Sequence, residues 1–269
     1  MLTRAAFHDR FGAAPLFGMV HLLPLPGAPL YGGSMDGILE AALADAQALQ
    51  EGGCAAIVFE NFGDRPFFKS EVPAITVAAM TRAITRTVAS VRLPFGVNVL
   101  RNDAASALAI AAATGASFVR VNVHTGAMLT DQGLVEGEAA RTMRLRASIA
   151  PAVMVFADVL VKHASPLVET DAVLAARDLR ERGLADALIV SGVETGAPAD
   201  RERLAVLRQA LQVPLLIGSG VTEQNIADYA SADGIIAGTS LKREGDVDAP
   251  VDPKRVARLA ALLRSSGGQ

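Results

Sequence analysis

The sequence has little of what marks an exported, membrane-spanning or disulfide-stabilised protein. Its single cysteine, Cys54, excludes an intramolecular disulfide framework. No apolar run approaches the roughly 18 residues that a membrane-spanning helix needs, and the amino terminus lacks the apolar core of a secretory signal. We therefore expect no membrane span and a cytoplasmic location.

Aromatic residues and charge of one sign are also scarce. Tryptophan is absent and aromatics make up 4% of the chain, which leaves little for stacking on bases. The 25 basic and 28 acidic residues are spread evenly and form no basic stripe. Nucleic acid is therefore not expected as a partner, although local donors could still hold a small anion.

Aliphatic runs alternate with helical patterns along nearly the whole chain. Hydrophobic residues make up 51% of it, which is ample for a buried core. Strands that alternate with helices predict a parallel sheet, and eight of them in a chain of this length predict an α/β fold of the (β/α)₈ TIM barrel type. An open doubly wound sheet shares the alternation and is the alternative. The eight predicted strands are 16–21, 56–60, 95–99, 117–123, 153–158, 187–191, 214–218 and 233–237.

No linker rich in proline or serine divides the chain. We predict an N-terminal segment at residues 1–14, a single (β/α)₈ barrel domain over residues 15–264 and a disordered tail at residues 265–269. Barrels often associate, so a homo-oligomer is expected.

Two runs of glycine and hydroxyl residues follow the last two predicted strands. Glycines let the backbone approach an anion, and N–H and hydroxyl groups can then donate to phosphate oxygens. In barrel enzymes this pair of loops is the usual phosphate site. Alternatively, the glycines only form tight turns, with Thr222 capping a helix that begins at Glu223. The predicted phosphate-binding residues are Gly192, Gly218, Ser219, Gly220, Gly238, Thr239 and Ser240.

Ionisable residues at the other strand ends are candidates for catalysis. Asp158 is expected to be a general base or a metal ligand, or else to form a salt bridge with Lys162 or Arg120 that only shapes the pocket. Lys162 neutralises a phosphate, forms a Schiff base if desolvated, or is an ordinary solvated lysine. The candidate catalytic residues are Asp158, Glu60, His124, Lys162 and His21.

The same rim carries candidate substrate-binding residues, among them arginines whose guanidinium groups match carboxylate or phosphate oxygens in pairs. They are Asn61, Asn98, Arg101, Arg120, Asn122, His163 and Ser191. Three histidines fall at strand ends, but none has a close His-x-His spacing. We therefore predict no cofactor and keep a divalent metal as a secondary possibility.

Several long motifs resemble the BtpA/SgcQ family. They are the run from Phe17 to Pro29, the runs 60–64, 96–102, 120–123 and 158–164, and Ser191-Gly192. The resemblance extends from about residue 15 to residue 250 and implies a barrel of the ribulose-phosphate-binding type. The family names refer to photosystem I biogenesis and to a gene set for carbohydrate or phosphosugar metabolism, and neither name defines a reaction.

Three functions are compatible with these features. The first is an enzyme that acts on a small phosphorylated sugar or nucleoside-derived metabolite by acid/base chemistry, as an isomerase, lyase or hydrolase. The second is a non-catalytic photosystem I biogenesis or stability factor, and the third is a regulator that binds a phosphometabolite. Polar residues at every predicted strand end favour chemistry, and the sequence shows no clear exposed apolar patch or membrane-facing amphipathic helix.

Overall fold

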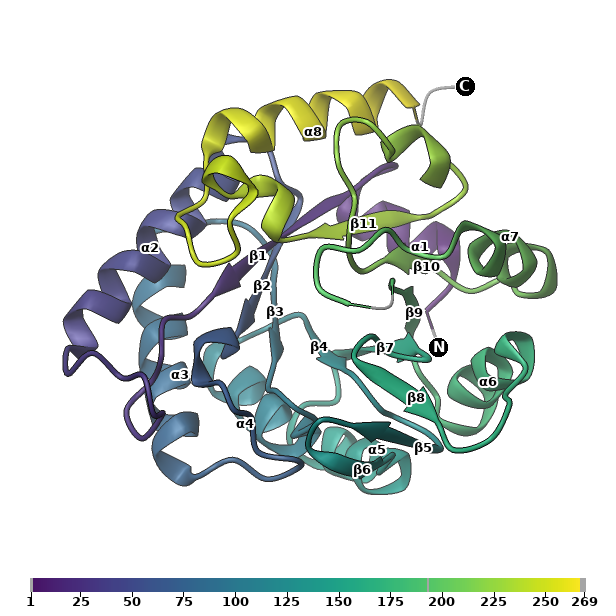
Figure 1. Ribbon diagram of the computed structural model, residues 1–269, viewed down its shortest axis with the longest axis horizontal. Coiled ribbons are helices and arrows are strands. Elements are labelled where there is room, and N and C mark those ends of the chain that lie inside the picture. Colours follow the sequence, from purple (N-terminus) through teal and green to yellow (C-terminus); the bar gives the residue numbers. More distant parts are fainter. Residues whose placement is uncertain (1, 193, 267–269) are drawn as a thin grey trace.

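A computed structural model describes residues 2–192 and 194–266, and in it eight parallel strands close into a barrel (Figure 1). Strand β1 pairs with both β2 and β11, which excludes an open sheet. Each strand lies within one residue of a predicted run or inside it, so the (β/α)₈ prediction is confirmed. The strands are β1 (Leu16–His21), β2 (Ala56–Glu60), β3 (Phe95–Asn98), β4 (Phe118–Val121), β7 (Met154–Val159), β9 (Ala187–Val190), β10 (Leu215–Ile217) and β11 (Gly234–Ala237).

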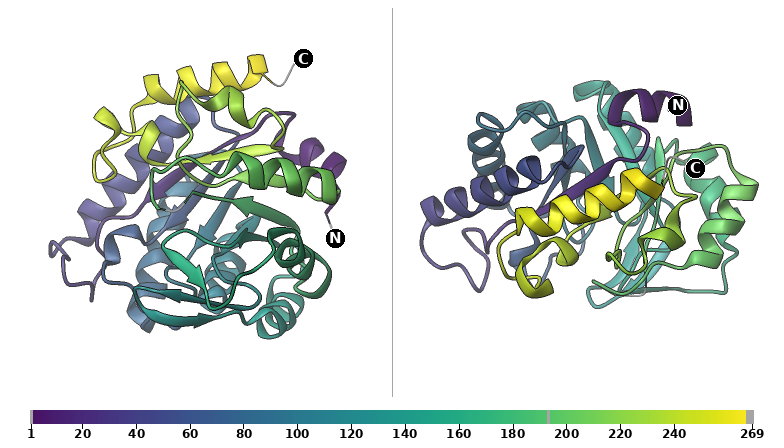
Figure 2. Two further views of the ribbon diagram at one scale, coloured as in Figure 1. Left: turned by 45° about the vertical axis from the view of Figure 1, so that its right-hand side comes forward. Right: turned by 90° about the horizontal axis from the view of Figure 1, so that it is seen from above.

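Helices surround the barrel on the outside (Figure 2). Helix α3 illustrates why they form where they do: it begins directly after Pro73, and its Met80, Ala83 and Ile84 recur at helical spacing and are buried. Among the described residues, no helix is long and apolar enough to cross a membrane. The surrounding helices are α2 (Met35–Glu51), α3 (Ala74–Val88), α4 (Ala104–Thr114), α5 (Ala139–Ile149), α6 (Ala172–Arg177), α7 (Arg201–Ala210) and α8 (Pro253–Ser266).

The segment after β10 differs from the helix that the sequence suggested. The Thr222 N–H donates to Asn225 Oδ1 at 2.8 Å, so the side chain closes a turn and no α-helix begins at Glu223. Only a short 3₁₀ helix, Ile226–Tyr229, follows. This loop is therefore open enough to contribute several backbone groups to the end of the barrel.

Helix α1 (Arg4–Phe11) closes the amino-terminal end of the barrel (Figure 2, right). Its Phe7 and Phe11 are buried against Phe17 and Phe156, with ring centroids 5.0 to 6.3 Å apart. Phe118 stacks on Phe156 at 4.5 Å in the same cluster. Aromatic side chains therefore fill the centre of this end of the barrel.

A small antiparallel sheet that the sequence analysis missed lies beside the carboxyl end. It consists of β5 (Ala127–Thr130), β6 (Gly133–Glu136) and β8 (Ala164–Pro166), and it covers a cluster that includes Val123 and Val161. These strands have three or four residues each and no regular alternation, so periodicity does not detect them.

The carboxyl terminus is helical further than expected. Helix α8 runs to Ser266 and therefore includes the first two residues of the predicted disordered tail. The remainder of that tail, residues 267–269, lies outside the described residues.

Candidate functional site

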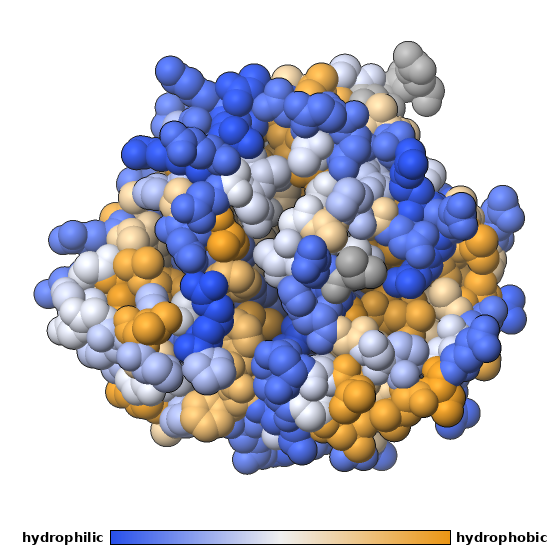
Figure 3. Space-filling model, in the orientation of Figure 1, coloured by the Kyte–Doolittle hydropathy of each residue, from blue (hydrophilic) through white to orange (hydrophobic). Residues whose placement is uncertain are grey.

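Two adjoining cavities open at the carboxyl end of the barrel, which is hollowed near its centre (Figure 3). The loop cavity, about 300 Å³, is lined by the loops after β10 and β11. The apolar cavity, about 1080 Å³, is lined by residues that follow β2, β3, β4, β7, β9 and β11, with Phe62, Phe67 and Leu100 among them. The residues common to both cavities are Glu60, Lys162, Thr195, Thr239 and Gly245.

Several backbone N–H groups at the loop cavity lack an acceptor, and four of them belong to the two glycine and hydroxyl loops after β10 and β11. Within residues 2–192 and 194–266, the amides of Gly220, Val221, Thr239 and Ser240 donate to no protein group. Gly220 has a φ of 67°, and a Cβ there would lie 2.0 Å from the Ala197 carbonyl oxygen, so only glycine fits this turn. Unpaired N–H groups that line one cavity form a concave array suited to an anion.

The hydroxyl groups of these loops have different roles. The Ser219 hydroxyl accepts the Gly192 N–H at 2.9 Å and donates to the Ala197 carbonyl at 3.3 Å, so it braces the loops against each other. The Gly192 amide is thereby occupied, and Gly192 is not among the described residues that line either cavity. Six of the seven predicted phosphate-binding residues do line the loop cavity, namely Gly218, Ser219, Gly220, Gly238, Thr239 and Ser240.

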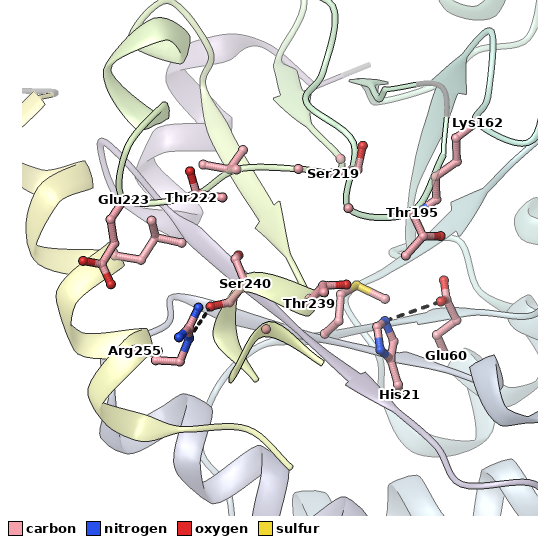
Figure 4. A pocket seen from close by; sticks show the side chains of 18 of the residues that line it. His21, Glu60, Lys162, Thr195, Ser219, Thr222, Glu223, Thr239, Ser240 and Arg255 are labelled. Atoms are coloured by element: carbon pink, nitrogen blue, oxygen red, sulfur yellow. Dashed lines mark hydrogen bonds and ion pairs between the residues drawn. The ribbon is translucent and has the colours of Figure 1, made fainter. Parts of the chain in front are cut away.

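His21 and Glu60 form an acid/base pair at the floor of the site (Figure 4). His21 Nε2 lies 3.7 Å from Glu60 Oε1, and its ring stacks on Phe62 at 4.5 Å. Burial, reinforced by the charges of Lys242 and Lys162, holds the pKa of His21 well below its usual value. Burial also raises the pKa of Glu60. The imidazole is therefore neutral, and the carboxyl group binds a proton more readily than an exposed glutamate does.

Lys162 reaches the same place from the loop after β7. In the described part of the chain its amine has no hydrogen-bond or ion-pair partner, while its carbonyl accepts a hydrogen bond from Arg101. Burial and the nearby Arg120 guanidinium lower the pKa of Lys162 to about 8. An appreciable fraction of this amine is therefore unprotonated near neutral pH.

Asp158 lies beneath the cavities in an ion pair with Arg120. Arg120 Nε and Nη2 donate to the two carboxylate oxygens at 2.9 and 2.8 Å, and the two side chains are 3% and 0% exposed. Asn122 donates to the same carboxylate at 3.4 Å, and Asn98 donates to Asn122 at 3.0 Å. The salt-bridge alternative is thus the arrangement observed: Asp158 positions Arg120, which lines the loop cavity.

Other predicted site residues do not reach the cavities. His124 places Nε2 2.8 Å from the Gly183 carbonyl, and Asn61 accepts the Leu100 N–H at 2.7 Å. Ser191 is buried beneath the site. Their positions give these residues structural roles, because a side chain turned into the barrel wall cannot touch a ligand. The predicted site residues that line neither cavity are His124, Asn61, Asn98, Asp158, Ser191 and Gly192.

The apolar cavity holds the remaining predicted binding residues. Arg101, Asn122 and His163 line it. His163 Nε2 accepts the Thr195 N–H at 2.9 Å, which links the loops after β7 and β9. No group of three histidine, cysteine or carboxylate side chains is placed to hold a metal in the ranges that the structure describes.

Comparison with known proteins identifies the family. Residues 13–265 match the model of the BtpA family. The chain belongs to the BtpA family. It is 47% identical over 245 residues to the photosystem I biogenesis protein BtpA of Synechocystis sp., covering 90% of this chain and 85% of that one. It is also 45% identical to an uncharacterized protein of Thermococcus kodakarensis, with 94% and 97% covered.

Solved structures share the barrel with this BtpA-family chain at low sequence identity. Thiamine phosphate pyrophosphorylase from Pyrococcus furiosus matches with a TM-score of 0.61 and 14% identity, covering 96% of this chain and 98% of that one. N-(5'-phosphoribosyl)anthranilate isomerase from the same organism matches at 0.60 and 10%, with 94% and 99% covered. At such identities the likeness shows the fold alone.

Several residues of the site were not predicted. Phe62, Arg65 and Phe67 directly follow the predicted Glu60 and Asn61, and their place in that loop was the available signal. Arg255 comes from α8, where its Nε donates to the Ser240 carbonyl at 2.9 Å (Figure 4). Nothing in a helical pattern distinguishes such an arginine from a surface one.

Proposed function

We propose that this BtpA-family protein is an enzyme that acts on a small phosphorylated sugar or nucleoside-derived metabolite. The phosphate group of this metabolite would accept hydrogen bonds from the amides of Gly220, Val221, Thr239 and Ser240. The observation that carries the proposal is that these four N–H groups, from two consecutive loops, are unpaired at one cavity. Arg120, which its ion pair with Asp158 holds in place, lines the same cavity.

The acid/base groups lie where the two cavities adjoin. With its phosphate in the loop cavity, a substrate would present its next carbons to Glu60 and Lys162, which line both cavities. Glu60 and neutral His21 can exchange a proton with these carbons or their oxygens. This chemistry suits an isomerase, a lyase or a hydrolase.

The rest of the substrate would enter the apolar cavity. Phe62 and Phe67 offer aromatic surface there, and Arg101 and His163 offer polar contacts at its edge. Such a lining favours a substrate with a less polar group at the end opposite the phosphate.

Thermal-shift measurements test the phosphate site. Inorganic phosphate and phosphosugars should raise the melting temperature, whereas the matching unphosphorylated sugars should not. Ser240→Pro removes one amide donor, and Ser240→Ala removes only the hydroxyl. The proline variant should lose most of the phosphate stabilisation and the alanine variant should keep it. A wild-type protein that no phosphorylated compound stabilises would contradict the proposal.

A second candidate function is a non-catalytic part in photosystem I biogenesis. The name of the Synechocystis relative suggests it, and so does an apolar surface that the sequence analysis did not find. Leu129, Leu134, Leu167 and Val168 are exposed on or next to the β5–β6–β8 sheet, where Figure 3 shows apolar side chains together. Alternation in such short strands does not reveal which face is buried.

Complementation separates the two functions. In a Synechocystis strain that lacks its BtpA, a scaffold would tolerate Glu60→Gln and lose function with Leu167→Asp and Val168→Asp. An enzyme would lose function with Glu60→Gln and tolerate Leu167→Asp and Val168→Asp. Photosystem I accumulation is the readout, and each variant is first checked for wild-type melting temperature.

A further inference from the structure

Lysine is used sparingly in this chain, and one of its lysines occupies the centre of the site. The chain has only four lysines among its 25 basic residues. Lys69 and Lys254 are exposed, and Lys242 is buried with its amine near Asp45 and the Ala249 carbonyl. Among the described residues, Lys162 is the one lysine that lines both the loop cavity and the apolar cavity.

Fixed positive charge is already supplied at this site by arginine. Arg120 lines the loop cavity and Arg101 lines the apolar cavity. An arginine holds its proton under all ordinary conditions, whereas a lysine amine can lose its proton and then form a covalent bond. Lys162 therefore offers a chemistry that its two neighbours cannot.

The surroundings of Lys162 leave its amine available. Arg101 holds the Lys162 carbonyl and so fixes the backbone of this residue. No carboxylate within ion-pair distance binds the amine in the part of the chain that is described. Figure 4 shows Lys162, from the loop after β7, and Glu60, from the end of β2, extending toward the same side of the cavity, with Thr195 between them.

Resting on the proposed function, we propose that Lys162 is a catalytic nucleophile that forms a Schiff base with the carbonyl carbon of a phosphorylated aldehyde or ketone. The phosphate would lie against the four unpaired amides, and the carbonyl would lie where the two cavities adjoin. The substrate class is thereby narrowed to phosphorylated aldehydes and ketones, with the less polar end of the molecule in the apolar cavity.

The step balances without any further reactant. The nitrogen lone pair forms a bond to the carbonyl carbon, and the carbonyl π electrons move to oxygen. The carbinolamine then loses its oxygen as water, which takes one proton from the amine nitrogen and one from a neighbouring acid. The iminium nitrogen can accept electrons from an adjacent C–H or C–C bond, and water later releases Lys162.

Glu60 is placed to be the neighbouring acid. It lines both cavities with Lys162, and burial raises the pKa of its carboxyl group, so that it binds a proton more readily than an exposed glutamate and can donate one to the departing hydroxyl. Burial and Arg120 lower the pKa of Lys162 to about 8. At neutral pH this gives on the order of a hundredfold more free amine than an ordinary surface lysine has.

Pyridoxal 5'-phosphate is a suitable probe because it carries an aldehyde, a phosphate and an aromatic ring. Wild-type protein is treated with the probe and reduced with borohydride, and the modified lysines are identified by peptide mass spectrometry. We expect the label mainly on Lys162 and expect inorganic phosphate to compete with it. Lys69→Met should label like wild type, whereas Lys162→Met should lose most of the label and any activity.

The outcomes separate this proposal from the proposed function. Stabilisation by phosphate without preferential labelling of Lys162 overturns the Schiff base and leaves the phosphate-binding enzyme. In another outcome, Lys162 is labelled, but phosphate neither reduces the labelling nor raises the melting temperature. That result supports a reactive lysine and overturns the phosphate site. Labelling spread evenly over the four lysines, with no effect of phosphate, overturns both. Mapping on the wild-type chain decides these cases even if Lys162→Met folds poorly.

Discussion

Replacing Lys162 by methionine should make the protein more stable at neutral pH while abolishing its reactivity. Burial lowers the pKa of Lys162 from 10.5 to about 8, so the folded chain resists holding this proton. Between pH 8 and pH 10.5 the unfolded chain binds more protons than the folded chain does, and stability therefore rises with pH across that window. Below pH 8 the amine is protonated in both states, and burial of its charge lowers the free energy of unfolding by the full amount.

The size of the effect follows from the pKa change. At about 1.4 kcal/mol for each pKa unit, burial of the charged amine lowers the free energy of unfolding by about 3 kcal/mol at pH 7. Methionine has a similar length and no charge, so the variant should gain about that much at pH 7 and little near pH 10.5. The charged groups that act on the amine are Arg120 and Arg101, which favour its neutral form, and Glu60 and Asp158, which favour its protonated form.

Urea unfolding measured at several pH values is the assay. Far-UV circular dichroism is the suitable signal, because the chain has no tryptophan. The exposed Lys69→Met variant is the control and should differ from wild type equally at every pH. A stability difference between Lys162→Met and wild type that does not change from pH 7 to pH 10.5 would mean that burial does not lower the pKa of Lys162.

Three further predictions concern the parts that support the site. Asp158→Ala leaves the Arg120 guanidinium buried without its partner and should lower the free energy of unfolding by about 3–5 kcal/mol, measured in urea; replacing both residues by apolar ones should restore most of the loss. Gly220→Ala puts a methyl group 2.0 Å from the Ala197 carbonyl oxygen and should remove phosphate stabilisation in a thermal-shift assay, and an unchanged shift would disprove the need for this turn. Phe11→Ala opens the aromatic cluster and should lower the free energy of unfolding by roughly 3–5 kcal/mol without changing the relative stabilisation by phosphate.

The barrel could be predicted from the sequence because its strands are fully buried. Runs such as Ala187–Val190 and Leu215–Ile217 are aliphatic on both faces, which is typical of parallel strands covered on both sides. The small β5–β6–β8 sheet lacks this signal, since its strands are short and partly exposed. Its apolar surface was missed for the same reason.

The candidate site could be predicted only where the position of a residue along its strand determines whether its side chain points into a cavity. Glu60 and His21 end their strands and line the loop cavity. Asp158 and Asn98 also lie near strand ends but form buried contacts instead. Whether such a side chain faces a cavity depends on its neighbours across the barrel. Asp158, for example, is held in the barrel by its ion pair with Arg120. Arg255 was missed because α8 reaches the site only through the tertiary fold.

The phosphate site can be observed in a crystal structure of the protein with inorganic phosphate. We expect an anion in the loop cavity that accepts hydrogen bonds from the amides of Gly220, Val221, Thr239 and Ser240. Phosphate bound elsewhere, with these four amides still unpaired, would contradict this expectation.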